Sequence, residues 1–277
     1  MKLIDAHTHI HFPAYGEDRA DVIARAEEKG IGMICVGTNT ETSQSAIDLA
    51  KQYSGQIWAT VGFHPNHAVP EQWYADKNES DQKREDFDRK RILELAKQSA
   101  VVAIGECGLD YYRLASHEKE IKEKQKEVFL AQIAIAQDVQ KPLMIHCRPT
   151  KGTNDAYEDL YSVLQSVKNR PEVVLHFYVG GPEVTKKFVE AGYHFTFGGV
   201  ITFARDYDHS IAQIPLERIM LETDAPYVAP ASQRGKRNES SFLEEIAQKL
   251  AELKGIGYDE VAKQTTENAR RVFKLNG

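Results

Sequence analysis

Short apolar runs alternate with helical patterns from one end of this 277-residue chain to the other. Each run is continuously apolar, which is typical of a strand buried on both faces, and the segments between runs place apolar residues at helical spacing. Strict alternation of strand and helix predicts a parallel sheet. The expected strands lie at residues 3–9, 31–37, 57–62, 101–104, 142–146, 173–176, 193–198 and 219–224.

The number of repeated units favours a closed barrel. They average roughly 35 residues each, which fits a single-domain (β/α)8 TIM barrel covering 1–277. A doubly wound open sheet is the alternative, but it usually carries a glycine-rich phosphate loop after its first strand, where this chain has His7-Thr8-His9. Thr40 or Thr42 is expected to cap a helix after the second strand. The charged segment 76–91 is interpreted as a solvated loop or the outer face of a helix.

The composition is that of an ordinary globular protein, with 42% hydrophobic and 27% charged residues and a net charge of −6. A nucleic-acid ligand would therefore be held by a local basic patch or by metal ions, not by the overall field. Three cysteines, an odd number, do not form a disulfide framework, which suits a reducing compartment. No apolar stretch approaches the ~20 residues that span a bilayer and no signal-type region begins the chain, so we expect a cytoplasmic protein.

Acidic and histidine side chains recur where the expected strands end. Glu106 follows the apolar run 101–104, and a buried carboxylate there needs either a counter-charge such as Arg113 or a metal ion. His7 and His9 lie two residues apart on the first strand and therefore share a face. Each member alone could be a satisfied polar residue, but together they predict a metal centre at the edge where barrels build their sites. The strand-end residues are His9, His64, Glu106, His146, His176 and Asp224.

The expected donors are imidazole and carboxylate groups without thiolate. Such a set suits Zn²⁺, or Mn²⁺ and Mg²⁺ when a substrate phosphate adds oxygen ligands. The number of ligands exceeds the needs of one structural zinc, so we expect two divalent cations bridged by Glu106. By strand alternation, Cys107 and Cys147 should face away from the ligands, beneath the outer helices. A nucleophilic Cys147 is the less favoured alternative, because an activated water already supplies the nucleophile.

Specific motifs are spread over the whole chain: His7-x-His9, Gly62-Phe63-His64-Pro65, Gly105-Glu106-x-Gly108-Leu109-Asp110-Tyr111-Tyr112, Ile145-His146-x-Arg148, Glu222-Thr223-Asp224-Ala225-Pro226-Tyr227, Arg234-Gly235-Lys236-Arg237-Asn238-Glu239 and Asn268-Ala269-Arg270-Arg271-Val272-Phe273. Together they resemble the motifs of the TatD family of metal-dependent deoxyribonucleases. The resemblance implies an amidohydrolase-superfamily barrel with 3′-to-5′ exonuclease action on DNA. It also implies one cation on His7, His9, Glu106 and Asp224, and a second on Glu106, His146 and His176.

The chain departs from the family pattern at three places. Phe177-Tyr178-Val179-Gly180 stands where the family usually has an aromatic or Cys-Phe-Ser-Gly run, which puts substrate contacts of that loop in doubt. Ser240 stands where a proline often does, and the charged stretch 76–91 looks longer than usual. None of these differences removes an expected ligand.

Roles follow for the remaining residues. Glu106 and Asp224 are the expected catalytic residues, with Asp224 as the base that orients the attacking water and takes its proton. Arg148 lies two residues beyond His146 on the same face and, with His64, is placed to bind a phosphate. Arg234 and Arg237, with Lys236, are either contacts to the backbone of the next nucleotides or part of a solvated loop.

Two other functions remain open at this point. One is a metal-dependent esterase or deacylase in the same barrel, for example on aminoacyl-tRNA. The other is a non-catalytic nucleic-acid-binding protein, which would need the basic loop but no intact ligand set.

Overall fold

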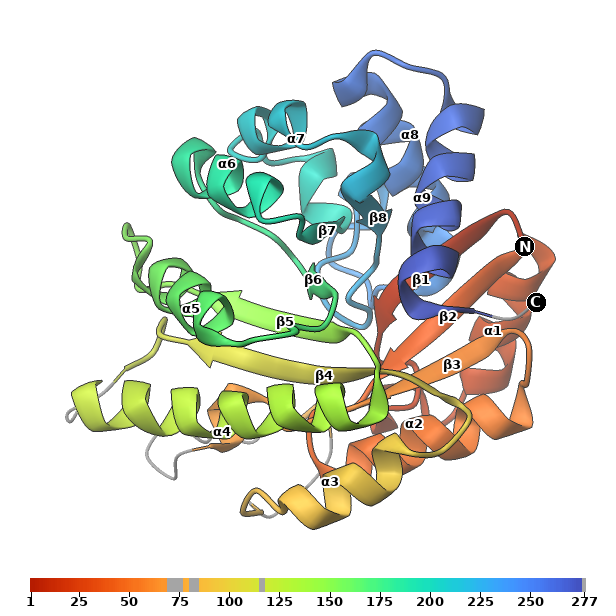
Figure 1. The fold of residues 1–277 in the computed structure, drawn as a ribbon. Coiled ribbons are helices and arrows are strands. Elements are labelled where there is room, and N and C mark those ends of the chain that lie inside the picture. Colours follow the sequence, from red (N-terminus) through yellow and green to blue (C-terminus); the bar gives the residue numbers. More distant parts are fainter. Residues whose placement is uncertain (69–76, 80–84, 115–117, 276–277) are drawn as a thin grey trace.

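Eight parallel strands close into one barrel, in which each strand pairs with the next along the chain and β8 pairs with β1 (Figure 1). The computed structural model describes residues 1–68, 77–79, 85–114 and 118–275. The predicted (β/α)8 architecture is confirmed. The strands are β1 (Leu3–Thr8), β2 (Ile31–Val36), β3 (Ile57–Val61), β4 (Val101–Asp110), β5 (Leu143–Arg148), β6 (Val173–Leu175), β7 (His194–Phe197) and β8 (Ile219–Leu221).

Helices follow the strands in sequence and surround the barrel (Figure 1). Their apolar stripes face the sheet, so strands buried on both faces can be continuously apolar, as the sequence predicted. The short helix α7 was not expected from the sequence. The helices are α1 (Arg19–Glu28), α2 (Thr40–Gln52), α3 (Arg89–Ala96), α4 (Glu118–Val139), α5 (Asp155–Ser166), α6 (Pro182–Glu190), α7 (Asp208–Gln213), α8 (Leu243–Lys254) and α9 (Tyr258–Phe273).

The structure corrects one local prediction and gives detail to another. The expected cap at Thr40 or Thr42 is wrong, because Asn39 caps α2: its side chain accepts from the Thr42 backbone N–H while the Thr42 side chain accepts from Asn39 N–H. In the charged segment 76–91, α3 begins at Arg89 after a turn at residues 77–79. Residues 76 and 80–84 of that segment lie outside the described residues.

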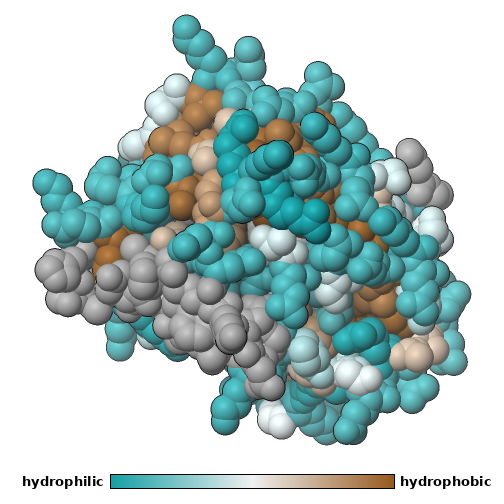
Figure 2. Space-filling view, turned by 90° about the horizontal axis from the view of Figure 1, so that it is seen from below, coloured by the Kyte–Doolittle hydropathy of each residue, from teal (hydrophilic) through white to brown (hydrophobic). Residues whose placement is uncertain are grey.

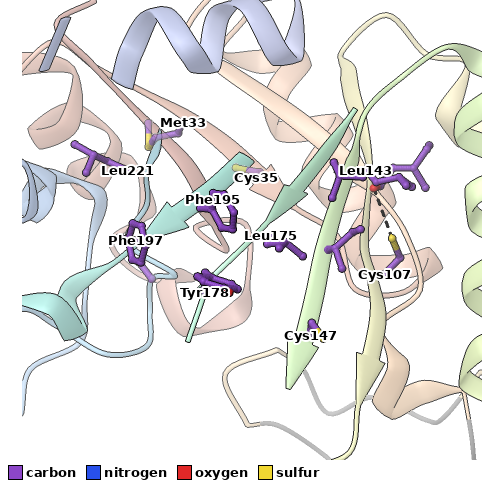
Figure 3. Close-up of a cluster of buried hydrophobic side chains, with 14 of the residues drawn as sticks. Met33, Cys35, Cys107, Leu143, Cys147, Leu175, Tyr178, Phe195, Phe197 and Leu221 are labelled. Atoms are coloured by element: carbon purple, nitrogen blue, oxygen red, sulfur yellow. Dashed lines mark hydrogen bonds between the residues drawn. The ribbon is translucent and has the colours of Figure 1, made fainter. Parts of the chain in front are cut away.

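Apolar side chains form two layers on opposite sides of the strands. The outer layer fills the space between barrel and helices, and it contains Cys35, Cys107 and Cys147 (Figure 3). Burial raises the pKa of the Cys107 thiol, which keeps it in the neutral form of a small hydrophobe. Cys107 is therefore buried under the helices as predicted, while Cys147 belongs to the same layer but also borders the cavity described below. The inner layer is composed of residues such as Ile34 and Met220 and is continued by the end of α9.

Extra residues interrupt the alternation in two strands. In β1 the pairing with β2 shifts between Asp5 and Thr8. In β4 the pairing with β3 shifts between Val101 and Ala103, and the pairing with β5 shifts between Ile104 and Cys107. Such bulges re-aim the side chains that follow them. Ala103 lies in the inner layer, so strict alternation would direct Glu106 outward. The bulge in β4 instead brings Glu106 to the inside of the barrel end, beside His7.

Among the residues coloured by hydropathy in Figure 2, hydrophilic ones cover most of the face shown, and hydrophobic ones emerge in areas between them. Among the described helices, none has both the length and the apolar character needed to cross a membrane.

Candidate metal centre

The predicted donor residues converge at the carboxyl ends of the strands, around Glu106. Its side chain is only 5% exposed, and each carboxylate oxygen faces a different set of imidazoles. Oε2 lies 3.5 Å from His7 Nε2 and 3.9 Å from His9 Nε2. Oε1 lies 3.0 Å from both His146 Nδ1 and His176 Nε2. Within the described part of the chain, histidines rather than a Lys or Arg surround this carboxylate, which favours the metal over a structural salt bridge.

The first donor group lies on the Oε2 side and joins both ends of the barrel sequence. His7 and His9 come from β1 and its end, with 3.1 Å between their Nε2 atoms. Asp224, just after β8, places Oδ1 3.6 Å from His7 Nε2 and 3.4 Å from His9 Nε2. Tetrahedral ligands at Zn–N distances of about 2.1 Å are about 3.4 Å apart. The spacing of these atoms therefore fits a cation held among them.

The second donor group lies on the Oε1 side. His146 Nδ1 and His176 Nε2 are 3.5 Å apart, and each is in contact with the same oxygen of Glu106. His64 Nε2 also approaches that oxygen, at 3.4 Å, and His64, Glu106 and His146 offer donor atoms that lie within 4.8 Å of one another. His64 was expected to bind substrate. The geometry makes it a possible ligand as well.

The protonation states of these side chains suit metal ligands, which lose any bound proton when a cation binds. Burial opposes ionisation of Glu106, yet His176 and His64 together with hydrogen bonds from the imidazoles hold the pKa of its carboxyl well below the usual range. Burial lowers the pKa of His7 to about 3, so this imidazole is neutral and free to donate a lone pair. Burial also disfavours the charged form of His146, but Asp110 and Glu106 raise its pKa. Cation binding is therefore expected to release protons.

Acceptors outside the donor set orient the imidazoles. His9 Nδ1 lies 2.8 Å from the carbonyl oxygen of Val36, and His146 Nε2 lies 3.1 Å from Asp110 Oδ2. Such partners fix the tautomer and the ring direction of a ligating histidine. His176 Nδ1 lies 3.6 Å from Glu222 Oε2, which is an ion-pair distance and not a hydrogen bond, and Glu222 is itself fully buried. From the sequence, Asp110 and Glu222 stood out only as parts of motifs, although an acid near a strand end was the available signal.

Asp5 ties the first and last strands together beneath the first donor group. Its carboxylate accepts hydrogen bonds from the backbone N–H and hydroxyl of Thr223, at 2.9 and 2.6 Å, and from the hydroxyl of Ser240, at 2.6 Å. Burial raises the pKa of Asp5 to about 7, although these hydrogen bonds oppose the rise. The departure at Ser240 from the family pattern therefore supplies a donor to a buried acid.

A cavity of about 540 Å³ opens above the donor atoms. One side carries the cationic residues Arg148 and Lys151, and the Arg148 guanidinium lies 3.7 Å from the centre of the Tyr112 ring. Aromatic rings make up much of the remaining wall, among them those of Phe12, Phe177, Tyr207 and Tyr227. Arg148 and His64, the predicted phosphate ligands, both line this cavity.

The basic cluster after β8 does not line the cavity. Arg234 stacks on Phe203, with 4.1 Å between guanidinium and ring centre. Arg237 donates to the carbonyl oxygen of Ala14 at 2.7 Å and pairs with Asp18. Arg237 thus contacts the N-terminal segment. Its position does not support the predicted contact with the nucleic-acid backbone.

A closed β/α barrel with buried nitrogen and oxygen donors at its carboxyl end defines the class of barrel metal hydrolases. A family model described as TatD related DNase matches residues 4–274, and the chain belongs to this family. It is therefore an enzyme, a metal-dependent hydrolase.

Individual relatives agree with this assignment. The chain is 36% identical to the uncharacterized metal-dependent hydrolase YabD of Bacillus subtilis over 280 residues, covering 99% of this chain and 100% of that protein. It is 34% identical to the 3'-5' ssDNA/RNA exonuclease TatD of Escherichia coli K12 over 282 residues, with 99% of both covered. The solved structure of the TatD homologue YJJV of Escherichia coli superimposes with a TM-score of 0.82 at 25% identity, over 99% of both chains.

Proposed function

We propose that this enzyme hydrolyses phosphodiester bonds of DNA as a 3′-to-5′ exonuclease, with two divalent cations in the centre around Glu106. The observation that carries the proposal is the position of the Glu106 carboxylate between the two donor groups. Each of its two oxygens faces a separate set of imidazoles. One cation would be held by His7, His9, Asp224 and Glu106 Oε2. The other would be held by His146, His176 and Glu106 Oε1, with His64 beside them.

The donor chemistry suits Zn²⁺, Mn²⁺ or Mg²⁺. When bound, such a pair supplies a water molecule of lowered pKa and neutralises the charge that builds on phosphoryl oxygens. Asp224 faces the cavity with a side chain that is 15% exposed, so it is placed to accept the proton of the attacking water. Glu106 is more deeply buried and holds the two donor groups together.

Arg148 is the expected phosphate ligand. Its guanidinium lies against Tyr112 on the cavity wall, which restricts the orientation in which its N–H groups are presented. A planar guanidinium can donate two parallel hydrogen bonds to a phosphate. Lys151 adds a second positive charge on the same wall.

The aromatic wall suits unpaired bases. Single-stranded nucleic acids are bound by cationic grooves whose aromatic side chains stack on successive bases. Tyr112 and Tyr227 line the cavity with side chains that are at least partly exposed, and unpaired bases would have these rings to stack on. The Escherichia coli relative named as an exonuclease of ssDNA and RNA is consistent with a single-stranded substrate.

An ester or aminoacyl-tRNA substrate would use the same donors. The cationic wall formed by Arg148 and Lys151 disfavours a small neutral ester, which presents no anion to it, but it does not discriminate against aminoacyl-tRNA, whose backbone phosphates lie beside the ester. The two activities are separated by comparing turnover of a single-stranded oligonucleotide with turnover of an aminoacyl ester under the same metal conditions.

The deciding experiment measures metal content and DNA digestion on the same preparation. We expect about two divalent cations per chain, and we expect a 5′-labelled single strand to shorten stepwise from its 3′ end. Removal of the cations with a chelator should abolish digestion, and their return should restore it. Digestion that persists in the metal-free protein, or products that shorten from the 5′ end, would contradict the proposal.

A further inference from the structure

Large exposed apolar side chains gather on the loops around the cavity. Among the described residues, Tyr112, Val179 and Phe203 are 41%, 39% and 40% exposed, and they follow β4, β6 and β7 respectively. The other exposed large hydrophobic residues are Met1 at the chain end and Leu130 on α4. A single exposed apolar side chain needs no explanation, but these three all follow strand ends on the side of the barrel where the cavity opens, and this grouping points to a ligand.

Two of these three side chains are aromatic, and an arginine covers the ring of each. Five contacts between a cation and an aromatic ring occur among the described residues, but the rings of Tyr15, Tyr111 and Tyr193 are buried in three of them. The two exposed rings are Tyr112 under Arg148 and Phe203 under Arg234. The first pair lines the cavity, whereas the second lies outside it.

The outer pair sits on two loops that are joined to each other and to the cavity. Phe203 follows the short 3-10 helix Gly199–Thr202, and Arg234 follows the 3-10 helix Ala231–Gln233. The backbone N–H of Ala231 donates to the Thr202 hydroxyl at 2.8 Å, which links the two loops. Tyr207 and Val228, from the same two loops, line the cavity. A single nucleic-acid strand that leaves the cavity past Tyr207 and Val228 would reach Phe203 and Arg234.

We propose that Phe203 and Arg234 form an outer nucleotide subsite, in which a base of the single strand stacks on the ring and the guanidinium contacts its phosphate. The proposal rests on the exonuclease function argued above and adds a binding position for the part of the strand that is not being cleaved. It accounts for an aromatic ring that remains 40% exposed while an arginine covers one face of it. Stacking on an aromatic ring is tolerant of base identity, as an enzyme that removes successive nucleotides requires.

The test compares substrates that differ in length. Phe203→Ala should raise KM for the twelve-nucleotide strand dT12 about tenfold, since the stacking contact with one base is lost. KM for the dinucleotide dT2 and turnover of bis(p-nitrophenyl) phosphate should stay within about twofold, since neither reaches beyond the cavity. Phe203→Trp should keep the wild-type KM for dT12. Leu130→Ala, which removes an equally exposed apolar side chain from an outer helix, is the matched control.

The outcomes separate the subsite from the function on which it rests. Equal increases in KM for dT2 and dT12 would assign Phe203 a structural role, and an unchanged KM for dT12 would remove it from the binding surface. If wild type cleaves neither nucleotide substrate, the exonuclease proposal fails instead. Binding of fluorescent dT12 to the metal-depleted protein then tests the subsite directly, with about tenfold weaker binding of Phe203→Ala expected and equal binding overturning it.

Discussion

The two ends of the barrel interior are built from the same strands but filled with opposite kinds of side chain. Toward the amino ends, Ile4, Ile34 and Met220 form an apolar inner layer that the end of α9 continues. Toward the carboxyl ends, histidines and carboxylates occupy the interior although nearly all of them are buried. Apolar burial stabilises the fold directly, whereas burial of these polar groups costs stability unless partners or cations compensate. Apolar burial in the amino half thus stabilises the fold, and this stability offsets the cost of burying the polar donor groups in the carboxyl half.

The largest effect is expected from the centre of the carboxyl half. Glu106→Ala removes the carboxylate that contacts both donor groups, so turnover should fall at least about a thousandfold and cation content should drop. The fold should remain intact, but the metal-free variant should unfold at a lower temperature than the metal-free wild type, because the imidazoles around Glu106 lose their counter-charge. Calorimetry and metal analysis check both parts. Wild-type turnover would refute the assigned role of Glu106.

The amino half should respond in the opposite way. Met220→Ala opens a cavity in the inner layer and should lower the free energy of unfolding by about 2–5 kcal/mol. Cation content at saturating metal and turnover of the folded fraction should remain near those of the wild type. Urea denaturation of the metal-free protein measures the first quantity. A stable variant that had lost its cations would break the proposed separation between the two halves.

A smaller effect on cation affinity is expected from Asp110, which contacts the donor residue His146. Asp110→Asn keeps the shape of the side chain but weakens the acceptor for His146 Nε2, and cation affinity should fall about 10- to 100-fold. Competition with a calibrated chelator measures this affinity, and the melting temperature of the metal-free protein shows whether the fold is intact. Asp138→Asn, a change at an exposed acid on α4, is the control and should leave affinity unchanged. An unaltered affinity in Asp110→Asn would show that the contact is incidental.

The smallest effect depends on pH. Burial raises the pKa of Asp5 to about 7, so the folded state binds more protons than the unfolded state between about pH 4 and pH 7, and this group lowers stability as the pH rises through that window. Ser240→Ala removes a donor that stabilises the charged carboxylate and should raise this pKa further. The variant should therefore lose about 1–3 kcal/mol at pH 8 and less at pH 5. Denaturant unfolding of the metal-free protein at both pH values tests the sign, and a larger loss at pH 5 would contradict it.

The sequence predicted the barrel and the convergence of its donors because both depend on simple periodic rules. Alternating strand and helix patterns define the architecture, and parallel strands bring their carboxyl ends to one edge. His7, Glu106 and Asp224 could be expected together for that reason alone. The bulges in β1 and β4 could not be expected, because nothing in the apolar run 101–104 signals an extra residue, and Glu106 faces inward only through that interruption.

Other details depend on contacts between distant segments. Arg237 was grouped with Arg234 because the two are close in sequence, but the residues that engage Arg237, Ala14 and Asp18, are more than two hundred positions away. The contacts of Asp110 with His146 and of Glu222 with His176 likewise depend on where the far nitrogen of each imidazole points. Such pairings follow from the closed barrel and not from spacing along the chain.

The first donor group joins residues 7 and 9 to residue 224, so an ion bound there would cross-link the two closing strands of the ring. Ligand that binds only the folded chain stabilises it according to its concentration and affinity. Metal binding should thus stabilise the pairing of β1 with β8. Transient separation of these two strands, and proteolysis that depends on it, should become rarer even when no substrate is present.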